Sequence, residues 1–326
     1  MKLNKQSSFF SAICACFAIV CFSLNDASVK ILSSQYPLHQ IIFIRSIIAI
    51  LFFFILIMPF YGGIKSIKTT RPAIHICRGF CLFITNMCLF LGLVALPIAE
   101  TISIFFINPC LTLFLSIVFL KERPTISRWI SVLIGLFGVI IILQPGTAEF
   151  QNAMIYPVMA ALGYSCLSIL TRKVGSTDTA SVMVFYINVF MLVISFLFGL
   201  FAGDGSLNMS SDPSMNFLLK KWETFAREDL SLYFAIGLSS LLGGFFISQA
   251  YKASDASFVA PFEYIAMPVA VVVGVILFSE WPSLMTWFGM LLIMFSGIFV
   301  FIWDSGRFRS IFDKKIDLAG LKIGKN

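Results

Sequence analysis

Two side chains of opposite charge lie deep inside apolar runs of the sequence. Asp26 lies about six residues before the end of the first run, and Arg45 lies about as far after the start of the second. At ~1.5 Å per helical residue, both are ~10 Å deep. A charge at the centre of a transmembrane helix costs about 2.5–3.5 kcal/mol, so each needs a partner or a cavity. We expect Asp26 and Arg45 to pair across adjacent helices, in a structural or a substrate-binding role, with Lys30 competing for Asp26.

Three further charged residues are candidates for a binding or coupling role. Glu263 follows Pro261 inside a late apolar run and is the most isolated carboxylate of the chain, which favours a functional role. Glu100 lies about one helical turn into its run, so an interfacial carboxylate is the alternative. Arg78 lies near the start of its run, which is the expected cytoplasmic end of the helix, where it could instead extend its guanidinium to the lipid headgroups.

Uncharged polar side chains inside the runs add hydrogen-bonding groups. They could bind a substrate or, alternatively, hold helices together. Prolines at 109, 261 and 268 remove backbone hydrogen bonds inside helices and leave carbonyls for a partner or ligand. The polar residues are Asn25, Asn86, Asn108, Tyr164, Asn188, Gln249 and Tyr264. The candidate substrate-binding or coupling set is Asp26, Arg45, Arg78, Asn86, Glu100, Asn108, Tyr164, Glu263 and Tyr264.

The composition indicates a membrane protein. Of 326 residues, 59% are hydrophobic and 12% are charged, against about 25% charged in a soluble domain. The net charge of +7 lies in a few loops and the C-terminal tail, a distribution typical of membrane topology and not of nucleic-acid binding. The eight cysteines fall inside apolar runs without a Cys-x₂-Cys pair, so we expect no metal, cofactor or disulfide.

Ten apolar runs are each close to the ~20 residues that cross a bilayer as a helix. They cover residues 9–32, 38–60, 73–95, 98–120, 126–144, 152–171, 179–201, 231–252, 257–279 and 282–303. A retained first helix is favoured over a cleaved signal peptide, because the first run is too long and lacks a clear cleavage site. Continuous runs favour helices over the alternating strands of a barrel.

The second half of the sequence repeats the first. Glu122-Arg-Pro-x₄-Trp129 recurs as Glu280-Trp-Pro-x₄-Trp287 at an offset of 158, and Pro109 recurs as Pro268 at an offset of 159. Gly138 and Gly297 are also 159 apart. We therefore predict a duplication. The repeated glutamates lie at helix ends beside prolines, where a loop-fixing role is favoured.

Lysine and arginine predict the topology. Eighteen lie on the side of the termini and four on the other side, which predicts that both termini are cytoplasmic. Five helices per repeat then give the two copies opposite orientations, as in secondary transporters. We predict an all-α integral membrane protein of ten transmembrane helices in two inverted five-helix repeats. The repeats are residues 1–148 and 149–306, the second with an extracytoplasmic insertion at 203–230, before a basic cytoplasmic tail at 307–326.

The long connection between the seventh and eighth runs predicts a surface helix. Ser211-Asp212-Pro213 is a helix-start signal, and Met215, Leu218, Trp222 and Phe225 then share one helical face. We expect residues 214–227 to form an amphipathic helix on the outer membrane surface.

These motifs resemble the drug/metabolite transporter superfamily, specifically its EamA-type ten-helix branch. The first half carries Leu96-Pro-Ile-Ala-Glu100, Pro109, Leu120-Lys-Glu-Arg-Pro124, Trp129, Gly138 and Gln144-Pro-Gly146; the second carries Ala260-Pro-Phe-Glu-Tyr264, Gly274, Phe278-Ser-Glu-Trp-Pro282 and Gly297. The family usually has glycine before the repeated glutamate, where Lys121 and Ser279 stand here. Arg71-Pro72 followed by Arg78-Gly79 is similar to the S-adenosylmethionine carriers of intracellular bacteria.

The resemblance implies a bacterial inner-membrane transporter of a small organic metabolite, such as an amino acid or nucleoside-like compound, that works by alternating access. Proton exchange on Glu263 or Asp26 and S-adenosylmethionine uptake are further expectations. The partners expected are a small-molecule substrate and membrane lipids, with the oligomeric state left open. An intramembrane enzyme is disfavoured because its catalytic motifs are missing from the sequence, and a channel because of the inverted duplication.

Overall fold

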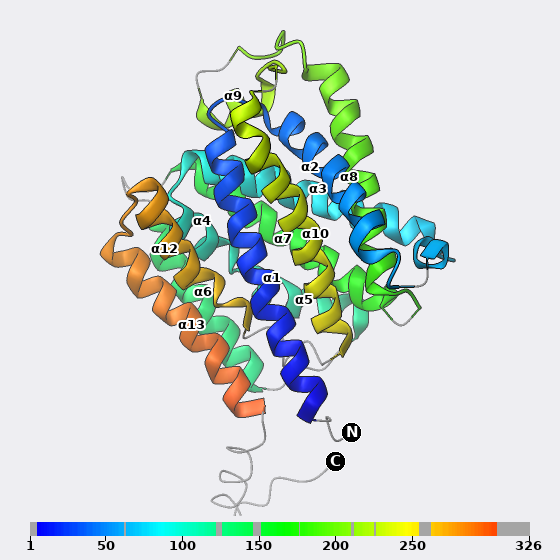
Figure 1. Cartoon of the computed structure of the whole chain (residues 1–326). Helices are drawn as coiled ribbons and strands as arrows, with labels where there is room; N and C mark the ends of the chain where they lie inside the picture. Colours follow the sequence, from blue (N-terminus) through cyan, green and yellow to red (C-terminus); the bar gives the residue numbers. More distant parts are fainter. Residues whose placement is uncertain are drawn as a thin grey trace, which may run out of the picture.

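The structure is a computed structural model, and it describes residues 5–61, 63–121, 126–145, 151–175, 177–209, 212–224, 226–253 and 262–304. These residues contain helices and no strand (Figure 1). The α-helices are α1 (Lys5–Leu32), α2 (Leu38–Phe52), α3 (Pro72–Ala95), α4 (Ile98–Phe105), α5 (Asn108–Leu120), α6 (Ile126–Leu143), α7 (Ile155–Val174), α8 (Ala180–Ala202), α9 (Pro213–Leu219), α10 (Leu230–Ala253), α12 (Ala266–Phe278) and α13 (Leu284–Asp304). A π-helical turn, Phe53–Ile57, extends α2, and 3₁₀ turns occur at Gly63–Ile67, Asn152–Met154 and Arg227–Asp229.

Helix lengths confirm an all-α membrane protein. Within the described part of the chain, seven helical segments are long and apolar enough to cross a bilayer. Three shorter apolar helices accompany them, at Trp129–Leu143, Ala266–Phe278 and Leu284–Phe299. Large apolar side chains such as Phe9, Leu133 and Ile276 are exposed on the outside of the bundle, where lipid can cover them. The count of ten spans and the inverted repeat remain predictions.

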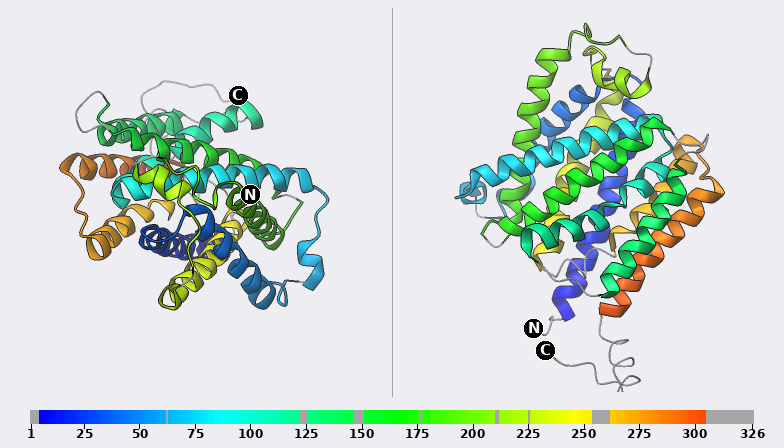
Figure 2. Two further views of the ribbon diagram at one scale, coloured as in Figure 1. Left: turned by 90° about the horizontal axis from the view of Figure 1, so that it is seen from above. Right: turned by 180° about the vertical axis from the view of Figure 1, so that it is seen from behind.

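Four helix pairs hold the bundle together, and each takes one helix from each predicted repeat. α1 packs along α10, α2 along α8, α3 along α7 and α6 along α13 (Figure 2). α6 and α13 approach closely where Gly138 faces Gly289, because a Cβ on Gly138 would lie 2.8 Å from the Gly289 carbonyl oxygen. The two halves are therefore interleaved along their whole length.

Two of the predicted spans are broken near their middle. The fourth divides into α4 and α5 at Phe106 and Ile107, just before Pro109. In the ninth, a turn at Tyr264 and Ile265 precedes α12, which contains Pro268. Proline cannot donate the backbone hydrogen bond that would continue a helix, which accounts for both breaks. α4 packs against α12, so the broken segments face each other.

The backbone at the ends of α5 and α12 explains why the family usually has glycine before the repeated glutamate. Lys121, which directly follows α5, has φ 54°, and Ser279, which directly follows α12, has φ 56°. This left-handed conformation favours glycine, because a Cβ there crowds the following carbonyl. The first copy of the Glu-x-Pro motif, Glu122 to Pro124, lies outside the described residues, as does Pro261.

The predicted surface helix at 214–227 is wrong over most of its length. Asp212 caps α9 by accepting the Met215 N–H at 3.0 Å, but α9 ends at Leu219 and residues 220–224 are not helical. There the side chain of Gln40 donates to the Glu223 carbonyl at 2.7 Å and accepts the Glu223 N–H at 3.0 Å.

The same segment packs on protein. Phe217 is buried, and the Ser214 hydroxyl donates to the Leu91 carbonyl at 2.9 Å. Trp222 lies against His39 and Phe43 of α2. Tertiary contacts therefore override the helical pattern, and the segment covers the ends of α2, α3 and α8 at the opposite end of the bundle from the start of α1 (Figure 1). Phe225, which belongs to the predicted apolar face, is outside the described residues.

Ser279→Gly is expected to stabilise the protein. Removing the left-handed strain adds ~1–2 kcal/mol to the free energy of unfolding, and the entropy cost of glycine subtracts ~0.5–1 kcal/mol. The net stabilisation is about 0.5–1 kcal/mol. The thermal unfolding midpoint in detergent should rise. Ser283→Ala is the control, because the Ser283 hydroxyl accepts the Thr286 N–H at 3.1 Å and caps α13, so its midpoint should fall. An unchanged or lower midpoint for Ser279→Gly would contradict this account of the turn.

Candidate functional site

A cavity of about 850 Å³ lies in the middle of the bundle. Its wall takes residues from α1, α2, α3, α4, α5, α6, α7, α8, α10, α12 and α13, and therefore from both predicted repeats. Pockets of about 300–1,000 Å³ are the usual size for small-molecule ligands. The cavity lies between the two broken segments, a common place for the site of a transporter.

The cavity brings together eight of the nine sequence candidates. Asp26, Arg45, Arg78, Asn86, Asn108, Tyr164, Glu263 and Tyr264 all line it, as do Asn25 and Asn188. Glu100 is the exception: it lies in the first turn of α4, outside the cavity wall. The wall thus carries charges of both signs, several amides and two phenols.

Asp26 and Arg45 do not form the predicted ion pair. The structure describes both residues and gives no nitrogen–oxygen distance within 4.0 Å between them. Instead the Asn25 amide donates to Asp26 Oδ1 at 3.4 Å, and the Arg45 guanidinium lies 5.7 Å from the centre of the Phe90 ring. Arg45 is 4% exposed, and its Nε has no hydrogen-bond partner within the described part of the chain. Both groups therefore keep hydrogen-bonding capacity at the cavity wall.

Lys30, the predicted competitor for Asp26, pairs with Glu280 instead. Its Nζ lies 2.6 Å from Glu280 Oε1 and donates to the Leu96 carbonyl at 3.0 Å. The other carboxylate oxygen of Glu280 accepts the Ile98 N–H at 2.9 Å, at the start of α4. We call Lys30, Leu96, Ile98 and Glu280 the Glu280 clamp. It joins α1 and α4 of the first half to the α12–α13 turn of the second.

The clamp lies at one end of the cavity. Ile98 lines the cavity there, whereas Arg172 and Gly175 at the end of α7 line its other end. This second end lies toward the face of the bundle where α1 begins and α13 ends, which we call the termini face (Figure 1). The cavity therefore extends from the clamp toward the termini face.

Aromatic rings form a wall at the helix breaks. Phe106 and Tyr264 stack with their ring centres 5.1 Å apart, and Phe105 meets Tyr164 edge-on at 5.4 Å. Gly297 makes room for this arrangement, because a Cβ on it would collide with the Tyr264 ring. Rings at this position can stack on a planar group of a ligand.

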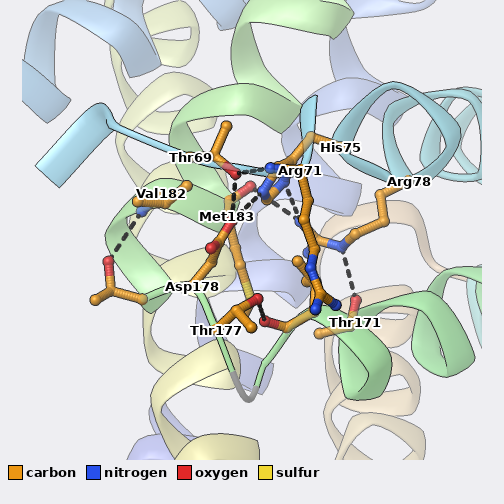
Figure 3. Close-up of polar contacts among 11 residues, drawn as sticks. Thr69, Arg71, His75, Arg78, Thr171, Thr177, Asp178, Val182 and Met183 are labelled. Carbon is orange, nitrogen blue, oxygen red and sulfur yellow. Dashed lines mark hydrogen bonds and ion pairs between the residues drawn. The ribbon is translucent and has the colours of Figure 1, made fainter. Parts of the chain in front are cut away.

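Arg78 does not extend toward lipid headgroups. It is 2% exposed and is held by several side chains around it (Figure 3). Its Nε donates to the Thr171 hydroxyl at 3.0 Å, and its Nη1 lies 3.2 Å from His75 Nδ1. His75 Nε2 in turn lies 2.7 Å from Asp178 Oδ2, which also accepts the Thr69 hydroxyl at 2.6 Å.

Sequence reasoning missed His75 and Asp178. One signal was present, since His75 precedes Arg78 by three residues and so lies on the same face of α3. Asp178 lies in the α7–α8 connection, and no spacing in the sequence relates it to α3. Burial acts to raise the pKa of Asp178, but the hydrogen bonds from Thr69 and His75 outweigh it and hold that pKa below its usual value.

Comparison with known proteins agrees with this architecture. Residues 9–144 match the model of the EamA-like transporter family. The resemblance to EamA-like transporters is confirmed. An S-adenosylmethionine uptake transporter of Rickettsia felis is 29% identical over 87% of this chain and 89% of its own length. A riboflavin transporter of Vibrio cholerae is 27% identical over 88% of this chain and 91% of its own.

A solved crystal structure shares the fold, with a TM-score of 0.61 at 15% identity over 89% of this chain and 95% of the other. Together the matches support a transporter function for this EamA-like chain, and its helices make it a multi-pass membrane protein. Transporters bind small molecules and work in lipid, which agrees with the cavity and with the apolar outer surface.

Gly297→Ala is expected to impair transport without unfolding the protein. The added Cβ forces the Tyr264 ring toward the cavity, and a displacement of about 1 Å at a binding site can lower rates by about 100-fold. Uptake in proteoliposomes measures the effect. Gly274→Ala is the matched control, because its Cβ would meet nothing closer than 3.6 Å. Equal uptake by the two variants would contradict a functional role for the Tyr264 ring position.

Proposed function

We propose that this protein is a secondary transporter that moves a zwitterionic, nucleoside-like metabolite across the bacterial inner membrane by alternating access, with both termini cytoplasmic. The observation that carries the proposal is the cavity between the two halves, whose wall includes Asp26 and Glu263 together with Arg45 and Arg78. Desolvated charges of both signs favour a ligand that supplies both opposite charges.

S-adenosylmethionine is the compound that we propose first. It has a carboxylate for an arginine, an ammonium and a sulfonium for the carboxylates, and an adenine for the aromatic wall. The name of the Rickettsia felis relative supports this choice. Riboflavin, the substrate in the name of the Vibrio cholerae relative, carries no net charge and would supply no charged group to pair with Asp26 or Arg45.

Counterflow in proteoliposomes tests the substrate. Vesicles preloaded with unlabelled S-adenosylmethionine should accumulate the labelled compound, as a carrier does and a channel does not. Arg45→Gln should raise the substrate concentration at half-saturation by at least about tenfold, since it removes one of the two buried guanidinium groups that the cavity offers to the substrate carboxylate. Arg227→Gln, a change at an exposed residue outside the cavity, should behave as the wild type. Riboflavin counterflow without S-adenosylmethionine counterflow would contradict the proposal.

Glu263 is the proposed proton carrier, with Asp26 as the alternative. A carboxyl group that is wetter in one facing state than in the other gains and loses a proton during the cycle. Glu263→Gln should therefore abolish the response of uptake to an imposed pH gradient and leave counterflow partly intact. Asp26→Asn should instead impair binding or folding, because it removes the anion nearest Arg45. An unchanged response of Glu263→Gln to the gradient would make its carboxylate structural.

A further inference from the structure

Arg78 differs from the other charged groups of the cavity because its orientation is set by a chain of hydrogen bonds. The chain runs from Thr69 through Asp178 and His75 to Arg78, and it connects the loop before α3, the α7–α8 connection and α3 itself (Figure 3). His75 and Arg78 are 1% and 2% exposed. The His75 ring also stacks on Tyr186 of α8, with the ring centres 4.9 Å apart.

The donors and acceptors of this chain determine the state of His75. A guanidinium can only donate, so Arg78 Nη1 donates to His75 Nδ1, which must carry no proton. Asp178 Oδ2 can then accept the proton on Nε2, so His75 is the neutral Nε2–H tautomer. The Thr171 hydroxyl donates to the Leu167 carbonyl at 2.7 Å, so its oxygen is free to accept from Arg78 Nε.

The remaining amino group of Arg78 is available to a ligand. Nε and Nη1 are used by Thr171, His75 and a longer contact of 3.5 Å to the Met183 carbonyl. Nη2 has no hydrogen-bond partner among the residues that the structure describes, and Arg78 lines the cavity. A buried cationic donor held in this way is suited to a carboxylate.

We infer that His75 and Asp178 are positioning residues that fix Arg78 as the carboxylate-binding group at the termini end of the cavity, and that protonation of His75 releases it. A proton from water at the termini face adds to Nδ1, which becomes a donor and can no longer accept from Arg78. Imidazolium and guanidinium then repel each other, while Asp178 keeps its bond to Nε2–H. Binding of the substrate carboxylate is therefore weakened by acid on this face.

Other charged and titratable groups around His75 leave this sequence of events unchanged. Tyr186 stacks on the ring and Asp178 binds Nε2, so Arg78 is the group that occupies Nδ1. Arg71 lies nearby in Figure 3, but it is exposed and its backbone N–H bonds to Thr69. Arg172, at the end of α7, lines the same part of the cavity. The inference rests on the proposed function for the identity of the carboxylate ligand.

The two histidines of the chain make a direct test possible by NMR of ¹⁵N-histidine-labelled protein. His39 Nδ1 lies 3.1 Å from the Leu218 carbonyl, so His39 should be the Nδ1–H tautomer and His75 the Nε2–H tautomer. His39→Asn assigns the signals by removing one of them. Arg78→Leu should move the Nδ1 signal of His75 toward that of an imidazole without a hydrogen bond. A protonated Nδ1 at pH 8, or no response to Arg78→Leu, would overturn the inference even in a protein that binds no S-adenosylmethionine.

Affinity supplies the second readout. The dissociation constant of S-adenosylmethionine, measured in detergent at one pH on both faces, should rise about tenfold as His75 becomes protonated in the NMR titration. His75→Asn keeps an acceptor for Arg78 and does not titrate, so its affinity should stay within about threefold of wild type and lose this pH dependence. An unchanged pH dependence in His75→Asn would overturn the switch. Absence of binding to the wild type would contradict the proposed substrate and leave the NMR result to decide the positioning.

Discussion

The contact between Glu280 and its partners is the constraint that sets the state of the whole bundle. One carboxylate neutralises Lys30 of α1 and caps the first turn of α4, two elements of the first half, from a turn of the second half. Partial burial makes the loss of either partner costly, since a charge would remain without compensation. Because the clamp lies at one end of the cavity, we propose that it closes that side. A carrier that alternates between faces must break this contact in every cycle. The free energy of the clamp contacts must therefore not exceed what substrate binding can supply.

The chemistry of the cavity depends on its place inside the bundle. Asp26, Arg45 and Glu263 line its wall, where opposite charges attract more strongly than in bulk water. Asp26 and Arg45 do not neutralise each other by direct contact, which leaves both able to bind a ligand. Arg78, by contrast, is restrained by His75 and Thr171. In the proposed function, the protein holds these groups apart and the substrate supplies the contacts that they do not make with each other.

Much of this architecture could be predicted from the sequence, because lipid restricts the backbone to helices and makes buried charges conspicuous. Asp26, Arg45 and Glu263 were found by that reasoning, and Pro109 and Pro268 indicated where the helices break. The failures concern contacts between distant segments. Helical spacing at Met215 and Trp222 was overridden by Gln40, which binds the backbone of Glu223. No sequence pattern could show that Lys30 pairs with Glu280 and not with Asp26, or that Asp178 binds His75. Both contacts depend on how the helices pack.

The most direct test of the clamp is the accessibility of a cavity residue from the clamp face. In membrane vesicles, with the eight native cysteines replaced, Ile102→Cys on the cavity wall is exposed to a membrane-impermeant thiol reagent added at that face. Asn208→Cys, on the surface segment beyond α8, controls for reagent access to that face. We predict slow labelling of position 102, faster labelling after Lys30→Gln, and slow labelling again in the charge-exchanged Lys30→Glu, Glu280→Lys protein. Equal labelling of position 102 with and without Lys30→Gln would contradict a clamp that closes this side of the cavity.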